Sequence, residues 1–112
     1  MRGKPWAVLL LVLLGPGAQS AEGNAWLVGT WQLAEDRKTP GFTDDYMDFE
    51  ANGAVTLRDG KRAYANCSYT PTGATVLLKC VVRGKEKLLS FQVASDRRSI
   101  ANPQGDIYRK RR

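Results

Sequence analysis

The residue types that could perform chemistry in this protein are few. The sequence contains no histidine, which excludes imidazole-based acid–base catalysis and histidine-containing metal sites. Serine and threonine hydroxyls therefore lack the base that usually activates them, and no spacing indicates a serine–lysine pair. The glycines occur singly, so no glycine-rich loop could hold a phosphate. We therefore expect a protein that is not an enzyme, with no catalytic residue and no cofactor.

Carboxylates gather in one segment, where they could bind a cation or form an acid–base pair. They are Asp44, Asp45, Asp48 and Glu50. Asp48 and Glu50 alternate with the apolar Met47 and Phe49, which is typical of the solvated face of a half-buried strand. The spacing does not match a calcium-binding loop. We interpret these carboxylates as surface charges and expect no metal site.

Cys67 and Cys80 are the only cysteines in the chain. In an oxidising compartment an even pair is more often a disulfide than two free thiols. A zinc site built on two cysteines would need carboxylate ligands as well. Both cysteines fall on inward faces of strands that one hairpin joins, so a cross-strand disulfide is geometrically reasonable. Alternation alone does not establish that the register places them opposite each other.

The elements that must position these residues are short strands separated by turn signals. The turn signals are Asn52-Gly53, Asp59-Gly60, Pro71-Thr72-Gly73, Arg83-Gly84 and Pro103-Gln104-Gly105. They predict strands over residues 26–33, 44–50, 54–58, 61–70, 74–82, 86–94, 99–101 and 106–109. The fold class is therefore all-β. We expect an antiparallel up-and-down meander of about eight short strands, closed or nearly closed into a barrel, because closure removes exposed edges.

Alternation along these strands assigns an inward face to one set of side chains. The set comprises Met47, Phe49, Val55, Leu57, Ala65, Cys67, Tyr69, Val76, Leu78, Cys80, Val82, Leu89, Phe91 and Val93. The aromatic residues Tyr46, Phe49, Tyr64, Tyr69 and Phe91 could line a pocket for an apolar ligand. Among them, the inward-facing Phe49, Tyr69 and Phe91 are the candidate ligand-binding residues. The alternative is that a barrel this small is filled by its own side chains.

The first twenty residues are predicted to be a secretory signal peptide. Arg2 and Lys4 give a basic start, residues 6–14 form an apolar run, and Ala18-Gln19-Ser20 supplies a cleavage site after Ser20. The apolar run is shorter than the about 20 residues that a membrane-spanning helix needs. We therefore expect a secreted or periplasmic protein with one small domain of about 90 residues.

Basic charge is concentrated at the C-terminus. The chain has a formal net charge of +6, and four of its bases are Arg109, Lys110, Arg111 and Arg112. Without this run and the leader, the bases and the acids are equal in number, which argues against a nucleic-acid-binding face. We divide the chain into a signal peptide at 1–20, a barrel at 21–108, and a strand end with a basic tail at 109–112. The tail either contacts an anionic surface or is a frayed, soluble end.

Several segments together resemble the small lipocalin-like domains of secreted proteins. They are Leu27-Val28-Gly29-Thr30-Trp31, Tyr46 to Glu50 followed by Asn52-Gly53, the tyrosine–turn–Val-Leu-Leu hairpin, and Ile107-Tyr108-Arg109. The resemblance implies that Trp31 closes one end of the barrel and that Arg109 from the last strand packs across its indole, as a structural pair. The chain is shorter than a typical lipocalin and has no C-terminal helix, so the resemblance does not imply a roomy cavity.

Two functions follow as hypotheses. The first is a non-enzymatic binding module that holds a small apolar or amphipathic ligand at the barrel mouth. The second is a protein-interaction module, such as an inhibitor or an envelope accessory protein, that uses its loops and basic tail. A continuous interior cavity would favour the first, and a filled barrel with an exposed apolar patch would favour the second. Asn66-Cys67-Ser68 also fits the N-glycosylation sequon, which applies only in a eukaryotic secretory pathway.

Overall fold

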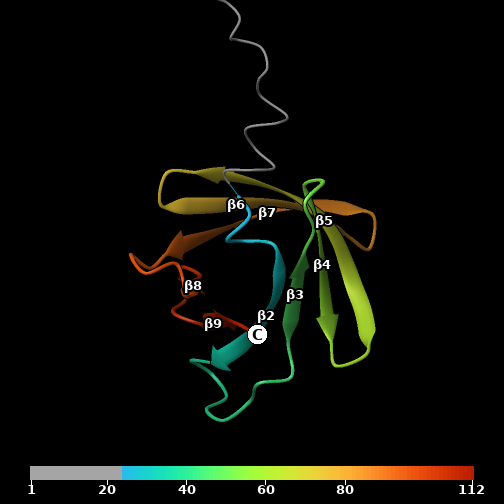
Figure 1. Cartoon of the computed structure of the whole chain (residues 1–112). Coiled ribbons are helices and arrows are strands. Elements are labelled where there is room, and N and C mark those ends of the chain that lie inside the picture. Colours follow the sequence, from blue (N-terminus) through green and yellow to red (C-terminus); the bar gives the residue numbers. More distant parts are fainter. Residues whose placement is uncertain (1–23) are drawn as a thin grey trace, which may run out of the picture.

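Eight antiparallel strands form a closed barrel in the computed structural model, which describes residues 24–112 (Figure 1). The strands are β2 (Gly29–Glu35), β3 (Tyr46–Phe49), β4 (Ala54–Asp59), β5 (Arg62–Thr72), β6 (Thr75–Val82), β7 (Lys85–Val93), β8 (Ser99–Ala101) and β9 (Ile107–Lys110). Each strand pairs with the next one along the chain, and β9 pairs with β2 to complete the circle. The expected all-β meander is confirmed. The predicted signal peptide lies outside the described residues.

The first strand begins later than the sequence pattern predicts. Residues 24–27 form a turn, in which the Leu27 N–H donates to the Asn24 carbonyl at 2.9 Å. The turn buries Leu27 completely, and its carbonyl accepts a 2.8 Å hydrogen bond from the Trp31 indole N–H. Trp31 is itself fully buried, so this bond satisfies the one polar group of the indole.

The expected inward face is confirmed along the central strands. Its buried members are Met47, Phe49, Val55, Leu57, Ala65, Cys67, Tyr69, Val76, Leu78, Cys80 and Phe91, and its partly buried members are Val82, Leu89 and Val93. Among residues 24–112, none of the buried residues is polar or charged. The barrel is therefore held by one apolar core, which is the dominant favourable term in folding.

Cys67 and Cys80 form a disulfide that joins β5 to β6. The two residues are opposite each other in the register, with their Cα atoms 4.0 Å apart. In an antiparallel pair this short spacing belongs to positions that do not exchange backbone hydrogen bonds. The expected cross-strand disulfide is confirmed.

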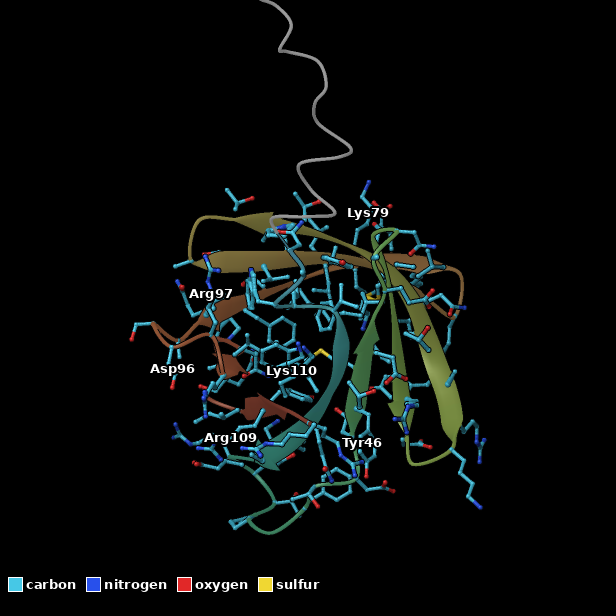
Figure 2. All side chains as sticks on the ribbon, viewed as in Figure 1. Tyr46, Lys79, Asp96, Arg97, Arg109 and Lys110 are labelled. Atoms are coloured by element: carbon cyan, nitrogen blue, oxygen red, sulfur yellow. A yellow bond between two sulfur atoms is a disulfide. The ribbon has the colours of Figure 1, made fainter. Side chains whose placement is uncertain are left out.

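The last strand, predicted over residues 106–109, spans Ile107–Lys110, and its basic residues Arg109 and Lys110 do not have the roles expected for them. Tyr108 points inward and is buried, so Arg109 points outward and Lys110 is the next inward residue. Lys110 is opposite Trp31 in the register, and Figure 2 labels both Lys110 and Arg109 on this side of the barrel. Arg109 instead lies 3.5 Å from the carboxylate of Glu35 on the exposed face. The expected packing of Arg109 across the Trp31 indole is therefore wrong.

Candidate functional site

An apolar cavity of about 230 Å³ opens at one end of the barrel, between β3, β4, β7 and the turn after β8. Its lining comprises Met47, Leu57, Tyr64, Leu88, Leu89, Ser90, Phe91, Asn102, Pro103, Gln104 and Tyr108. Its buried lining residues are apolar or aromatic, whereas the more exposed Ser90, Asn102 and Gln104 contribute polar side chains. An apolar floor with a few polar groups at its edge is the usual composition of a small-ligand site.

The cavity exists because β7 is much longer than its neighbour β8. The two strands pair only at Gln92 with Ala101 and at Val93 with Ile100. The N-terminal part of β7, from Lys85 to Phe91, pairs with β6 alone among the described strands. The gap beside this part of β7 is the space that the cavity occupies.

A hydrogen-bonded turn ends β8 and forms the opposite wall of the cavity. The Asn102 N–H donates to the Asp106 carbonyl at 3.1 Å, while the Asp106 N–H donates to the Asn102 side chain at 2.9 Å. Hydrogen bonds from the Arg37 backbone N–H and then from Asn102 lower the pKa of the Asp106 carboxyl. Gly105 has φ of +96°, and a Cβ there would lie 2.9 Å from the Arg37 guanidinium. The turn is therefore closely fixed by its own contacts.

Two tyrosines of the cavity share one carboxylate. The hydroxyl of Tyr64 donates to one oxygen of Asp45 at 2.7 Å, and the hydroxyl of Tyr108 donates to the other. Burial, followed by the hydrogen bond to Asp45, raises the pKa of both phenols well above its usual value. Both hydroxyls therefore keep their protons at neutral pH. Because each proton is directed at Asp45, the phenol oxygens offer only acceptor lone pairs to a ligand.

Sequence reasoning placed Asp45 among the surface carboxylates and gave it no role at the cavity. Tyr108 lies 63 positions from Asp45 in the chain, so no local spacing could show the contact. Tyr64 is turned toward Asp45 at an irregularity of the β4–β5 pair, where Leu57 is opposite Ala65 but Arg58 is opposite Ala63. Such a bulge re-aims a side chain and breaks the alternation on which face assignments depend.

The structure separates the three aromatic residues predicted to bind a ligand. Phe91 lines the cavity, with its ring 5.9 Å from that of Tyr108 in an edge-to-face arrangement. Phe49 and Tyr69 do not line it. They pack edge to face on each other, with their ring centroids 5.0 Å apart. Phe49 also packs edge to face with Trp31, at a centroid distance of 6.4 Å. These two residues belong to the packed core, as expected when a small barrel is filled by its own side chains.

The basic residues of the C-terminus do not form an isolated tail. Arg97 and Arg98, in the turn between β7 and β8, line one open depression together with Arg109 to Arg112. Figure 2 shows Arg97, Arg109 and Lys110 on the same side of the barrel. Arg97 is partly engaged, because its guanidinium lies 5.0 Å from the centre of the Trp26 ring. The depression is nevertheless lined by six cationic side chains.

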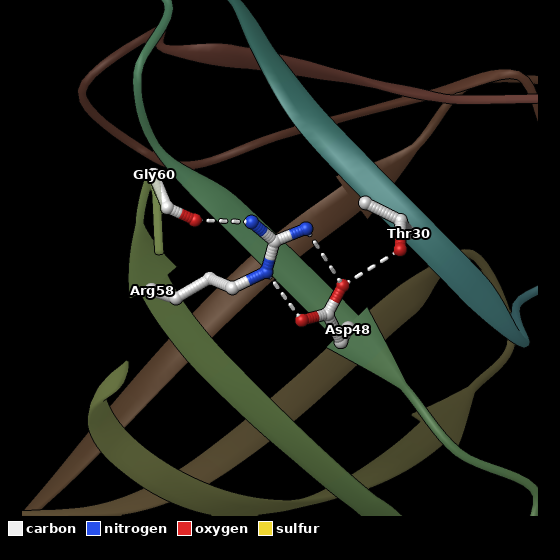
Figure 3. A network of polar contacts seen from close by, with 4 residues as sticks. All are labelled: Thr30, Asp48, Arg58 and Gly60. Atoms are coloured by element: carbon white, nitrogen blue, oxygen red, sulfur yellow. Dashed lines mark hydrogen bonds and ion pairs between the residues drawn. The ribbon is translucent and has the colours of Figure 1, made fainter. Parts of the chain in front are cut away.

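A second charged group ties three strands together on the outside of the barrel (Figure 3). Asp48 accepts hydrogen bonds from Arg58 Nε at 2.6 Å and from the Thr30 hydroxyl at 2.7 Å, while Arg58 also donates to the Gly60 carbonyl. Burial acts to raise the pKa of Asp48, but the hydrogen bonds from Arg58 and Thr30 outweigh it and lower the pKa. The network joins β2, β3 and β4 through one residue of each strand.

Neither the remaining features of the described residues nor comparison with known proteins indicates a specific function. No group of three or more potential metal ligands occurs within residues 24–112, and this part of the chain contains no helix able to span a membrane. Comparison with protein-family models, with curated proteins and with solved structures finds no match. The cavity beside Phe91 is therefore the feature from which we derive a function.

Proposed function

We propose that this protein is a non-enzymatic binding module that takes a small apolar part of an amphipathic ligand into the cavity beside Phe91. The observation that carries this proposal is the composition of the cavity wall. Met47, Leu57, Leu89 and Phe91 supply apolar side chains, whereas the polar groups come from Ser90, Asn102, Gln104 and the hydroxyls of Tyr64 and Tyr108. Such a surface disfavours a fully polar ligand, because polar groups placed against its apolar part would lose water without gaining partners.

The size of the cavity limits the ligand. Its volume of about 230 Å³ exceeds the roughly 150 Å³ of an engineered cavity that binds benzene, and it is below the roughly 300–1,000 Å³ of drug-sized sites. A chain of five methylene groups would gain about 4 kcal/mol on burial, which corresponds to a dissociation constant of about 1 mM. Tighter binding therefore requires contacts outside the cavity.

The Tyr64–Asp45–Tyr108 group determines which charge and which hydrogen-bonding groups the polar end of the ligand can carry. The carboxylate is negative, and both phenol oxygens present lone pairs rather than protons. A ligand carboxylate there would meet acceptors and a like charge. We therefore propose a neutral or donor-bearing head group rather than a fatty acid.

Action outside the cytoplasm is part of this proposal. The Cys67–Cys80 disulfide supports it, since such bonds persist in oxidising compartments. The basic start and apolar run of the first twenty residues also support export. A closed eight-stranded barrel with a buried tryptophan on its first strand is compatible with the lipocalin resemblance, which we retain as part of the proposal.

A titration with hexan-1-ol, followed by amide chemical shifts, tests the proposal. We expect the largest shift changes along β7 and in the turn from Asn102 to Gly105. The variant Leu89→Trp, which fills the cavity, should lose this response, whereas Leu77→Trp on the outer face of the same hairpin should keep it. Equal responses in both variants would overturn the proposal. The melting temperatures of both variants show whether they are folded.

A second candidate function is contact with an anionic surface. Arg97 and Arg98 extend the basic run of the C-terminus into one cationic depression. Binding to vesicles that contain anionic lipid should then fall steeply with salt, because surface charges are screened. Binding that does not change between low and high salt would exclude this function.

A further inference from the structure

We propose that the ligand of the cavity is an extended peptide segment, which pairs with the free edge of β7 and inserts one apolar side chain beside Phe91. The inference rests on the proposed function, because it uses the same cavity and specifies what fills it. Two independent features meet at this place: unpaired backbone groups of a strand and an apolar hole of side-chain size. An extended polypeptide is the ligand that satisfies both.

The hydrogen bonds at the end of β7 show which way its backbone groups point. The Val93 N–H donates to the carbonyl of Ala74, next to β6, at 2.7 Å. The Ala94 N–H donates in the opposite direction, to the carbonyl of Ser99 on β8, at 3.0 Å. Backbone groups alternate in direction along an antiparallel strand. Odd-numbered residues of β7 therefore face β6, and even-numbered residues face the side of β8.

Within residues 24–112, this alternation leaves three residues of β7 whose outward-directed backbone groups have no strand partner. The pairing of β7 with β8 extends toward the N-terminus of β7 only as far as Gln92. The backbone N–H and C=O groups of Glu86, Leu88 and Ser90 therefore point into the gap. No backbone hydrogen bond to another described segment occupies them. A row of unpaired donors and acceptors is a template for an added strand. Leu88 and Ser90 also line the cavity, so the free edge and the cavity are one continuous site.

The cavity has the size that one side chain of an added strand would need. Side chains of an extended segment alternate between the two faces of a sheet. Those on the inner face would lie beside Leu89 and Phe91, which are inward-facing residues of β7 at the cavity. Those on the outer face would lie beside Leu88, a residue that is 74% exposed. One inward side chain per segment fits a hole of about 230 Å³.

Charge indicates the chemistry of the partner. The N-terminal end of the edge carries an excess of positive charge, from Lys79, Arg83, Lys85 and Lys87 against Glu86. The one ion pair there, between Lys79 and Glu86 at 3.7 Å, is exposed and weak. A peptide with an acidic residue near this end and an apolar residue at the cavity is complementary. A second copy of the same chain would bring the same positive charge, which disfavours self-pairing.

The experiment uses a displayed library of random heptapeptides, selected on the disulfide-bonded protein. We expect the selected sequences to contain an apolar residue next to acidic ones. The tightest sequence is then synthesised in two N-methylated forms, one for each set of alternate residues. Pairing with an edge uses the N–H groups of one set only. One form should therefore lose at least about tenfold in affinity, while the other form binds within a few-fold of the unmodified peptide.

A substitution in the protein gives an independent test. Leu88→Pro removes an N–H that faces the gap and takes no part in the pairing with β6, so the strand should tolerate it. Compared with Leu88→Thr, which also removes the leucine side chain but keeps the N–H, it should bind the peptide at least about tenfold more weakly. On peptide binding, the N–H groups of Glu86, Leu88 and Ser90 should become protected from hydrogen exchange.

The opposite results are equally definite. Failure to select any peptide, equal loss in both N-methylated forms, or equal binding by Leu88→Pro and Leu88→Thr would each overturn the peptide inference. Dimerisation that protects the same N–H groups without peptide would show that a second copy is the occupant and would also overturn it. Binding of hexan-1-ol distinguishes a failure of the peptide inference from a failure of the proposed function. If the alcohol binds and no peptide does, only the peptide inference fails; if the unaltered protein does not bind the alcohol, the proposed function fails.

Discussion

The ammonium of Lys110 donates a 2.7 Å hydrogen bond to the backbone carbonyl of Trp26, 84 positions earlier in the chain. This contact ties the last strand to the turn that precedes the first one. Gly29 makes it possible, because a Cβ at this residue would lie only 3.1 Å from Lys110 Cε. The Arg111 N–H adds a 2.8 Å bond to the carbonyl of Thr30 on β2. The barrel is therefore closed by residues that appear in the sequence as part of a basic tail.

Replacing Lys110 by methionine should destabilise the protein by about 1–3 kcal/mol, since the Trp26 carbonyl would lose its charged donor while the aliphatic stem is retained. The measurement is urea denaturation of the purified protein. Arg112→Met is the matched control, because Arg112 is exposed at the end of the chain; it should change the stability by less than about 0.5 kcal/mol. Equal effects of the two substitutions would show that Lys110 does not close the barrel.

Strand alternation predicted the core correctly but could not assign the contacts at the ends of strands. The pattern around Val76, Leu78 and Cys80 is regular, and each of these residues is buried. At the C-terminus, the expectation for Arg109 came from a family resemblance rather than from alternation. The inward position of Tyr108 places Lys110, not Arg109, on the inner face. A contact over 84 positions depends on closure of the barrel, which a local pattern does not encode.

Removing the disulfide should lower the free energy of unfolding by about 3 kcal/mol in the chain-entropy model, because it closes a loop between cysteines that are 13 positions apart. The double variant Cys67→Ala with Cys80→Ala should show this loss in urea denaturation. The control is the addition of a reductant, which should destabilise the unaltered protein and leave the double variant unchanged. A reductant effect of equal size in both proteins would contradict the assignment.

The pKa of Asp48 predicts a loss of stability in acid. The folded state lowers this pKa below its ordinary value of 3.8, so the ionised carboxylate stabilises the protein above about pH 4. This contribution is lost as the pH falls through the lower, folded-state pKa. Asp48→Asn should therefore be less stable by about 1 kcal/mol at neutral pH, since partial exposure screens the pair with Arg58.

The difference between the unaltered protein and Asp48→Asn should shrink as the pH is lowered below about 4. Urea denaturation at a series of pH values measures it. Glu86→Gln is the control, because its pair with Lys79 is exposed and should contribute little. A difference that stays constant down to pH 2 would show that the Asp48 carboxylate is not the group responsible.

The candidate site was less predictable than the fold, for reasons that individual residues make clear. Phe91 was correctly expected to face inward, but the cavity beside it results from the short length of β8 and from the Asn102–Asp106 turn. Phe49 carries the same pattern and lies in the packed core instead. Alternation shows which side chains face inward. The gaps that remain between them depend on strand lengths and bulges, which are set by the whole barrel.

The most direct test of the binding function is a filtered nuclear Overhauser experiment on the isotope-labelled protein with unlabelled hexan-1-ol. The terminal methyl group of the alcohol should show cross-peaks to the ring protons of Phe91 and Tyr108 and to the methyl groups of Leu57. Cross-peaks confined to the outer-face residues Leu77 and Val81, both exposed, or no cross-peaks under saturating alcohol, would contradict the proposal that the cavity beside Phe91 is a ligand site.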